Sequence, residues 1–370
     1  MEVTKPSRGA LVVTVSVATV LAALVIVGRL TDQGLRPPRG PHASTSIPLL
    51  VTPPPTATTL QPVVARITFG GDQVGAVAAS PGVVWVAHGC ALSRVDPHRN
   101  RVVATVAGIP RRGQDCGIGG LAAGTNAVWA LTGQGLARID PHANRVTRMI
   151  RLPGTSGLAL TATSVWVGCC GPAGPIGPRS RGRLARIDPA SGRVVATIGL
   201  AGLPGEVGAG PSGVWVTGRG GPIWRVDPTS GKVVATIRVP GGLGGLPREG
   251  PAGEAGDVLV GRDAVWVSNP ANAEVLRIDP RRNQLQGRAF TGGPALVKAD
   301  GVVWGTSSTT LVPLNDQARR EVPLGELGQP DEFLDEQGQL DEISDLAAGP
   351  DAVWVVAPAG LFRVDLARVH

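Results

Sequence analysis

The stretch AVAASPGVVWVAHGCALSRVDPHRNRVVATV, residues 76–106, decides the fold, because the chain repeats it with variations almost to its end. The next copy is GLAAGTNAVWALTGQGLARIDPHANRVTRMI, residues 120–150. The copies are marked by Trp85, Trp129, Trp166, Trp215, Trp266, Trp304 and Trp354. These tryptophans are 37 to 51 residues apart, which is in the range of a four-stranded propeller blade. The sequence therefore predicts seven blades.

Each copy reads as four strands, which we letter A to D in chain order. Strand A is rich in small residues, strand B is Val-Trp-Val, strand C ends in Arg-Ile/Val-Asp-Pro, and strand D is Val-Val-Ala-Thr-Ile. The Asp-Pro pair suits the first two positions of a tight turn, and three residues later comes an Asn or Gly that tolerates a left-handed backbone. These residues are Asn100, Asn144, Gly192, Gly231 and Asn283.

The first and last copies are incomplete in complementary ways. DLAAGPDAVWVVAPAGLFRVD, residues 345–365, has no strand D after it, whereas PVVARITF, residues 62–69, precedes the first copy. We expect the early segment to supply the missing strand, which closes the ring and leaves no unpaired edge. The sixth copy is degenerate, with LVPLND in place of Arg-Ile-Asp-Pro. The prediction is an all-β chain, a seven-bladed β-propeller of four-stranded blades over residues 61–370.

Through its VWV, RIDP and RVVATI segments, the chain resembles the YVTN-repeat family of seven-bladed propellers, which are related to NHL-type and streptogramin lyase propellers. The resemblance covers about residues 61–370 and implies the architecture more strongly than the function. Such propellers include binding modules, sensor ectodomains and a few enzymes. The resemblance also implies that a lyase would carry several histidines on its loop face, and this chain has no matching set.

The N-terminal sixty residues predict a membrane tether and a spacer. After a short tail, residues 1–9, the stretch ALVVTVSVATVLAALVIVG, residues 10–28, is long and apolar enough for a transmembrane helix acting as a signal anchor. A cleaved signal peptide is the alternative. Residues 29–60 are rich in Pro, Ser and Thr and predict a disordered linker. We expect a single-pass, extracytoplasmic propeller with its N-terminus inside.

The composition excludes one class of partner. The net charge is +7, but the basic residues are spread over the repeats and no run of them forms a patch, so nucleic-acid binding is not expected. The hydrophobic content of 42% indicates a packed core despite 53 glycines and 33 prolines. The tryptophans are expected between blades. The arginines that recur in strand C are expected to pair with strand neighbours rather than bind an anion.

One face of the disc is expected to carry function. The A to B and C to D loops are short, whereas every long insertion falls between strands B and C or between D and the next A. These insertions are residues 107–117, 168–183, 240–256 and 325–342. We call this side the long-loop face and the other side the short-turn face.

Three carboxylates recur at one position, nine residues before a tryptophan: Glu206, Asp257 and Asp345. The column after it is entirely apolar, so alternation points the acids toward the central channel, near its mouth on the long-loop face. Converging carboxylates suit a divalent cation such as Ca²⁺ or Mg²⁺, or a cationic ligand. The alternative is that they are solvated acids at the rim.

Cysteine and histidine suggest further sites on the same face. Cys90 and Cys116 are expected to form a disulfide in an oxidising compartment. The adjacent Cys169 and Cys170 either form a strained vicinal disulfide or stay reduced as a metal or redox site. His88 with the four cysteines is a further candidate for a soft-metal site, although blades one and three are not adjacent.

The function expected from these observations is a membrane-tethered, non-enzymatic binding or sensing module. Its long-loop face would bind a protein, a glycan or a small molecule. The alternative is a metal-dependent enzyme, either lyase-like or a hydrolase, on the same face.

Overall fold

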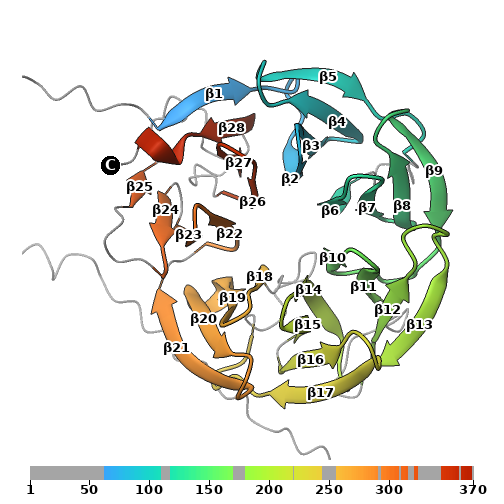
Figure 1. Cartoon of the computed structure of the whole chain (residues 1–370), viewed down its shortest axis with the longest axis vertical. Coiled ribbons are helices and arrows are strands. Elements are labelled where there is room, and N and C mark those ends of the chain that lie inside the picture. The colour runs from blue at the N-terminus through green and yellow to red at the C-terminus, as the bar shows by residue number, and fades with distance from the viewer. Residues whose placement is uncertain are drawn as a thin grey trace, which may run out of the picture. The chain divides into compact units, whose positions relative to one another are not determined.

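The structure is a computed structural model that describes residues 62–109, 117–169, 180–219, 221–243, 256–290, 293–307, 310–315, 321–323, 343–357 and 360–368. Within these ranges the chain forms seven four-stranded antiparallel sheets around a central axis (Figure 1). The all-β, seven-bladed propeller is therefore confirmed. The predicted tail, transmembrane helix and linker, residues 1–60, lie outside the described residues and stay predictions. No helix in the described part is long and apolar enough to cross a membrane.

The first four blades follow the predicted order of strands, from the innermost strand A to the outermost strand D. Blade one contains β2 (Val74–Ser80), β3 (Val83–His88), β4 (Ala91–Asp96) and β5 (Arg101–Thr105). Blade two contains β6 (Ile118–Ala123), β7 (Val128–Thr132), β8 (Gly135–Asp140) and β9 (Arg145–Ile150). Blade three contains β10 (Leu158–Leu160), β11 (Val165–Cys169), β12 (Arg183–Ile187) and β13 (Val194–Gly199). Blade four contains β14 (Pro204–Gly210), β15 (Gly213–Gly218), β16 (Ile223–Asp227) and β17 (Lys232–Ile237).

The last three blades complete the ring. Blade five contains β18 (Val258–Val260), β19 (Val265–Asn269), β20 (Glu274–Asp279) and β21 (Gln284–Phe290), with the short 3-10 helix η1 (Pro270–Asn272) between β19 and β20. Blade six contains β22 (Leu296–Ala299), β23 (Val302–Ser307), β24 (Thr310–Pro313) and the two-residue β25 (Val322–Pro323). Blade seven contains β26 (Asp345–Ala348), β27 (Val353–Ala357), β28 (Gly360–Val364) and β1 (Val63–Ile67), and the 3-10 helix η3 (Leu366–Arg368) follows β28.

The ring closes as the sequence predicts. Strand β1 pairs antiparallel with β28, with Val63 opposite Val364 and Ile67 opposite Leu361 (Figure 1). The seam continues past the strand, because the backbone N–H of Asp365 donates to the carbonyl of Pro62. The N-terminal strand thus covers the outer edge of blade seven, which would otherwise be unpaired.

The Asp-Pro turns form by the predicted chemistry. In each of them the aspartate Oδ1 accepts hydrogen bonds from the second and third backbone amides that follow, as Asp188 does from Ala190 and Ser191. These bonds hold the pKa of the aspartates below the ordinary value. In these turns the residues predicted to take a left-handed φ do so, at 49° to 64°: Asn100, Asn144, Gly192, Gly231 and Asn283.

The recurring tryptophans lie between blades, as expected. All seven are at most 7% exposed, and each belongs to a cluster that joins residues of two neighbouring blades. Trp166, for example, packs with Val207 and Val216 of blade four. The seven tryptophans therefore act as core residues between the blades.

The recurring arginines bridge neighbouring blades rather than neighbouring strands alone. The guanidinium of Arg186 lies 5.4 Å from the ring centre of Trp166, opposite it in the same blade, and donates to the Pro228 carbonyl in the Asp-Pro turn of the next blade. The same donation to the next turn is made by four arginines: Arg94 to Pro141 (3.4 Å), Arg138 to Pro189 (3.3 Å), Arg186 to Pro228 (3.0 Å) and Arg225 to Pro280 (2.5 Å). The repeat thus encodes a clamp between blades.

The degenerate sixth blade departs from this clamp. Pro313 takes the place of the arginine opposite Trp304, and Asn315 replaces the turn aspartate, with Oδ1 accepting from the Val303 amide at 2.6 Å. Arg277 of blade five stacks over Trp266 at 5.7 Å but makes no described hydrogen bond to blade six.

Candidate ligand-binding site

A cavity of about 320 Å³ lies at the mouth of the central channel, and we call it the mouth cavity. Its walls are the first residues of the innermost strands, among them Ala76, Gly120, Glu206, Asp257 and Asp345. Because the chain enters each blade at this end of strand A, the mouth cavity lies on the long-loop face. A volume of this size matches the lower end of small-molecule pockets, which start near ~300 Å³.

All three predicted carboxylates line the mouth cavity. The apolar column beside them also contributes to its wall, while packing against the preceding blade, as Val77 does against Trp354 of blade seven. The acids alternate with these apolar residues along strand A and therefore take the other side of each strand.

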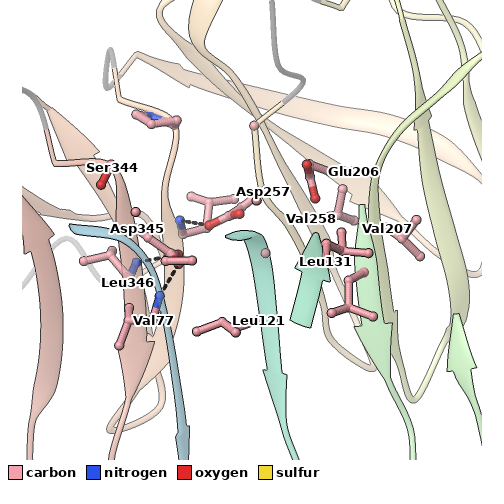
Figure 2. Close-up of a pocket in the computed structure, with 18 of the residues that line it drawn as sticks. Val77, Leu121, Leu131, Glu206, Val207, Asp257, Val258, Ser344, Asp345 and Leu346 are labelled. Carbon is pink, nitrogen blue, oxygen red and sulfur yellow. Dashed lines mark hydrogen bonds between the residues drawn. The ribbon is translucent and has the colours of Figure 1, made fainter. Parts of the chain in front are cut away.

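Asp257 and Asp345 each tie one blade to the next. Oδ2 of Asp257, just before β18, accepts a hydrogen bond of 2.8 Å from the backbone N–H of Leu296 in blade six. Oδ2 of Asp345, at the start of β26, accepts one of 2.8 Å from the backbone N–H of Val77 in blade one, and its Oδ1 accepts from its neighbour Leu346. Figure 2 draws these bonds. Two carboxylates on blades five and seven are thus held rigidly, on either side of blade six.

Both aspartates have raised pKa values. Burial in the cavity raises the pKa of Asp257 to about 6 despite the hydrogen bond from Leu296. Burial raises the pKa of Asp345 to about 8, and the charge of Asp257 adds to the rise, which shows that the two carboxyl groups interact. At neutral pH the pair therefore holds about one proton and one negative charge.

Glu206 is the third acid of the mouth cavity but stands apart from the pair. It lies in β14 of blade four, across the cavity from Asp345 (Figure 2). Among the described residues, no three His, Cys, Asp or Glu side chains come together as a group able to hold a metal ion. Glu206, Asp257 and Asp345 therefore do not form a three-carboxylate metal site here, and their role in binding a cationic ligand stays a prediction.

Glycines explain part of the pattern of charges around the channel. At Gly157, the position that corresponds to the acids in blade three, a Cβ would stand 2.3 Å from the backbone nitrogen of Val207. The strands of blades three and four approach too closely there for any side chain. A full ring of carboxylates is thus excluded by packing.

His88, the histidine predicted on the long-loop face, is held in a hydrogen-bonded chain. Its Nδ1 donates to Oδ2 of Asp72 at 2.9 Å, its Nε2 lies 2.8 Å from Oγ of Ser93, and its ring stacks on Phe69 at 4.4 Å. The order of contacts is that of a Ser-His-Asp triad. Ser93, however, is only 1% exposed, so its hydroxyl cannot meet a substrate. These contacts of His88 instead fasten the connection between β1 and β2 to blade one.

The cysteine predictions are partly tested. Cys90 is in the disulfide-bonded form, while Cys116 lies outside the described residues, so the pairing of these two cysteines stays a prediction. Cys169 is a buried thiol at the end of β11, which leaves the vicinal disulfide with Cys170 unsupported; Cys170 also lies outside the described residues. The soft-metal site is unsupported too, because both ring nitrogens of His88 contact Asp72 and Ser93.

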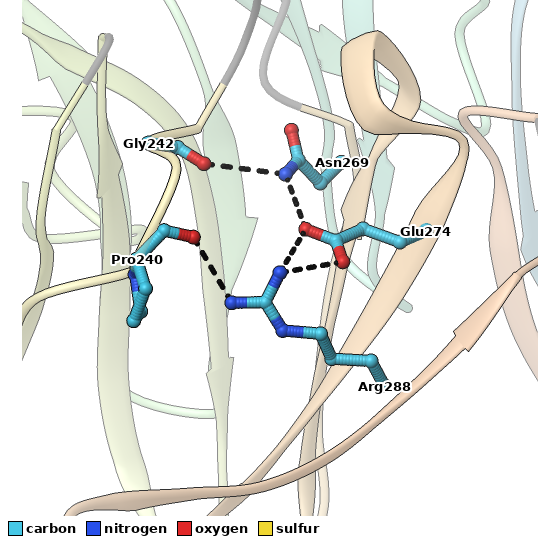
Figure 3. A network of polar contacts seen from close by, with 5 residues as sticks. All are labelled: Pro240, Gly242, Asn269, Glu274 and Arg288. Carbon is cyan, nitrogen blue, oxygen red and sulfur yellow. Dashed lines mark hydrogen bonds and ion pairs between the residues drawn. The ribbon is translucent and has the colours of Figure 1, made fainter.

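A buried ion pair on the long-loop face was not predicted. Glu274, 3% exposed, accepts from Arg288 at 2.8 Å and from Asn269 at 2.9 Å, while Arg288 also donates to the Pro240 carbonyl (Figure 3). Asn269 donates further to the Gly242 carbonyl. The network ties blade five to the chain that leaves β17 of blade four. A glutamate and an arginine 14 residues apart give no signal of this contact in the sequence.

The short-turn face also has a hollow, although its loops are short. A cavity of about 730 Å³ lies between blades two and three, lined by Trp129, Arg138, Thr161 and the turns at Asn126 and Ala190. The guanidinium of Arg138 already donates hydrogen bonds to the Pro189 carbonyl and to the Thr147 hydroxyl. We therefore interpret this cavity as the groove that a turn leaves between two neighbouring blades.

Comparison with known proteins supports the architecture. No protein-family model matches the sequence, and no curated protein matches it. Virginiamycin B lyase from Staphylococcus aureus matches in structure with a TM-score of 0.59 and 14% identity, over 82% of this chain and 98% of that chain. A streptogramin B lyase matches with a TM-score of 0.55 and 16% identity, over 81% and 96%.

A third similar structure is an extracellular domain. The extracellular part of the one component system BT4673 from B. thetaiotaomicron matches with a TM-score of 0.56 and 14% identity, over 81% of this chain and 39% of that chain. At such identities the likeness shows the fold alone. The chain is a seven-bladed β-propeller of four-stranded blades, similar in fold to streptogramin B lyases and to this extracellular domain.

Proposed function

We propose that the propeller binds a small cationic ligand in the mouth cavity, with Asp257 and Asp345 as its anionic partners. The observation that carries the proposal is the pair of carboxyl groups with raised pKa values at a cavity that opens on the long-loop face. Near pH 7 a cation that enters would replace the proton that the pair holds, so binding should release protons.

An organic cation suits the pair better than a bare metal ion. Calcium takes roughly six to eight oxygen ligands, and the pair offers at most four carboxylate oxygens, three of which already accept backbone hydrogen bonds. An ammonium group needs only three acceptors, which carboxylate and carbonyl oxygens at a channel mouth can provide. The ligand class is therefore a primary amine or a related cation.

The propeller would act as a non-enzymatic binding or sensing module, tethered outside the cytoplasm by residues 10–28. The disulfide at Cys90 supports an oxidising compartment, and an extracellular domain of similar fold supports the same placement. A metal-dependent lyase or hydrolase is the alternative, and no described group of three metal-ligating side chains favours it.

Calorimetric titration of the full chain with n-butylamine tests the proposal. The amine stays protonated up to about pH 10, so its affinity should rise between about pH 6 and pH 9 as Asp345 loses its proton. Asp257→Asn and Asp345→Asn should each weaken binding at least ~10-fold at pH 8. Asp351→Asn, an exposed acid of the same blade seven on the short-turn face, is the matched control and should bind as the wild type does. No binding, or equal binding by all variants, would refute the proposal.

A further inference from the structure

A second cavity, of about 240 Å³, adjoins the mouth cavity on the long-loop face, and we call it the side cavity. Both are lined by Gly119, Leu131, Ser156 and Glu206. Because these four residues belong to both walls, the two cavities form one elongated cleft across blades two, three and four. A ligand bound at the aspartate pair therefore has a path along the face.

The two ends of this cleft carry opposite charges. Arg219, which follows β15, lines the side cavity, and the described residues give its exposed guanidinium no hydrogen bond or ion pair. Asp257 and Asp345 line the mouth cavity at the other end. Arginine is the side chain best suited to a carboxylate or phosphate, because its planar fork donates two parallel hydrogen bonds.

Glycines keep the side cavity and its passage open. A Cβ added at Gly117, Gly119 or Gly133 would meet nothing within 4 Å, and none of the three has a left-handed φ. Neither packing nor backbone conformation thus requires glycine at these positions, and a larger residue there would fill the cleft. Their effect in the folded protein is to leave room above the backbone where the two cavities join.

Hydroxyl groups line the wall near Arg219. Thr132, Thr155 and Ser156 contribute to the side cavity, so its lining is polar without a further acid besides Glu206. Glu206 stands at the junction, where it would face the middle of a bound chain. The cleft thus offers an anionic end at Asp257 and Asp345, a middle of hydroxyl groups with one further carboxylate at Glu206, and a cationic end at Arg219.

We infer that the ligand is a zwitterion, with its ammonium group at Asp257 and Asp345 and its carboxylate at Arg219. This inference rests on the proposed function and specifies the ligand class. It requires a molecule long enough to reach from one cavity to the other, rather than a compact cation.

Three probes with the same six-carbon chain distinguish the ligand classes by calorimetry on the full chain: n-hexylamine, 6-aminohexanoate and 1,6-diaminohexane. We expect 6-aminohexanoate to bind about fivefold more tightly than n-hexylamine, the gain of one partly exposed ion pair. Arg219→Gln should abolish this advantage and leave the affinity for n-hexylamine unchanged. Arg238→Gln, an exposed arginine that follows β17 on the same face, is the matched control and should keep the advantage.

A steric variant gives an independent check. Gly119→Leu places a side chain in the open space at the junction, so it should weaken 6-aminohexanoate more than it weakens n-butylamine. Tighter binding of the diamine than of the amino acid, or an advantage that persists in Arg219→Gln, would overturn the zwitterion inference while the cation proposal stands. If n-hexylamine and 6-aminohexanoate both fail to bind, both proposals fail.

Discussion

The carboxylate of Asp345 accepts a hydrogen bond of 2.8 Å from the backbone amide of Val77, which lies 268 residues earlier in the chain. The bond joins the first residue of β26 in blade seven to strand β2 of blade one. The same carboxylate repels Asp257 across the channel mouth. One side chain thus links the closure of the ring to the charge of the candidate site.

Replacing Asp345 should change how stability depends on pH. The pKa of Asp345 is raised to about 8 in the folded state from an unfolded value of 3.8, so its neutral form favours folding below about pH 4 and that contribution is lost as the pH rises through 8. In Asp345→Asn the free energy of unfolding should therefore fall less steeply between pH 5 and 9. The slopes of the wild type and the variant should differ by up to ~1.4 kcal/mol per pH unit. Urea titrations at several pH values measure this slope.

Two comparisons isolate the effect. Asp351→Asn should keep the wild-type slope, since it is exposed on the opposite face. The turn aspartates have lowered pKa values, so their contribution is present above about pH 4 and is lost only in more acid solution. Parallel slopes for wild type and Asp345→Asn between pH 5 and 9 would contradict the burial of this carboxyl group.

The clamp between blades gives a second prediction. Arg186→Leu removes the stack on Trp166 and the hydrogen bonds to the Pro228 carbonyl and to Ser164, so unfolding should become easier by about 1–3 kcal/mol. Arg277→Leu loses the stack on Trp266 but no described hydrogen bond, and should cost less. Thermal unfolding of the two variants measures the difference. An equal loss of stability in Arg186→Leu and Arg277→Leu would mean that the hydrogen bond to the next blade contributes nothing.

The clamp also shows where reading the sequence reaches its limit. The Asp-Pro turns could be predicted residue by residue, because the backbone conformation at Asn100 or Gly192 depends on neighbours a few positions away. The recurrence of Arg186 and its equivalents could also be recognised in the sequence. The acceptor of their hydrogen bonds could not be predicted, because Pro228 lies 42 residues away and is brought close only by the angle between blades.

The candidate site was predictable to a similar depth. Counting back from the tryptophans placed Glu206, Asp257 and Asp345 on one column, and all three line the mouth cavity. Whether they converge depends on the width of the channel, which no local pattern encodes. Asp257 and Asp345 interact across blade six, whereas Glu206 adjoins the side cavity and Arg219.

The buried pair of Glu274 and Arg288 gives a third prediction. Glu274→Gln removes the charged partner of Arg288, whose side chain is 32% exposed, so the free energy of unfolding should fall by about 1–3 kcal/mol. The exposed pair of Arg281 and Asp263 is the control, and Arg281→Gln should cost less than ~1 kcal/mol. Chemical denaturation measures both. A loss no larger for Glu274→Gln than for Arg281→Gln would show that the pair does not hold blade five.

Truncation at the N-terminus tests the seam of the ring. A chain that begins at residue 61 keeps β1, its pairing with β28 and the bond from Asp365 to Pro62, so it should fold as a monomer with the full stability of the propeller. A chain that begins at residue 71 loses β1 and exposes the outer edge of β28, together with the buried Ile67 that packs on Leu361. We expect it to unfold more easily by at least ~3 kcal/mol and to associate through the free edge, because burial of one isoleucine side chain alone contributes about 1.5–3 kcal/mol. Size-exclusion chromatography and thermal unfolding compare the two chains. If the chain that begins at residue 71 is monomeric and as stable as the chain that begins at residue 61, closure of the ring by β1 is disproved.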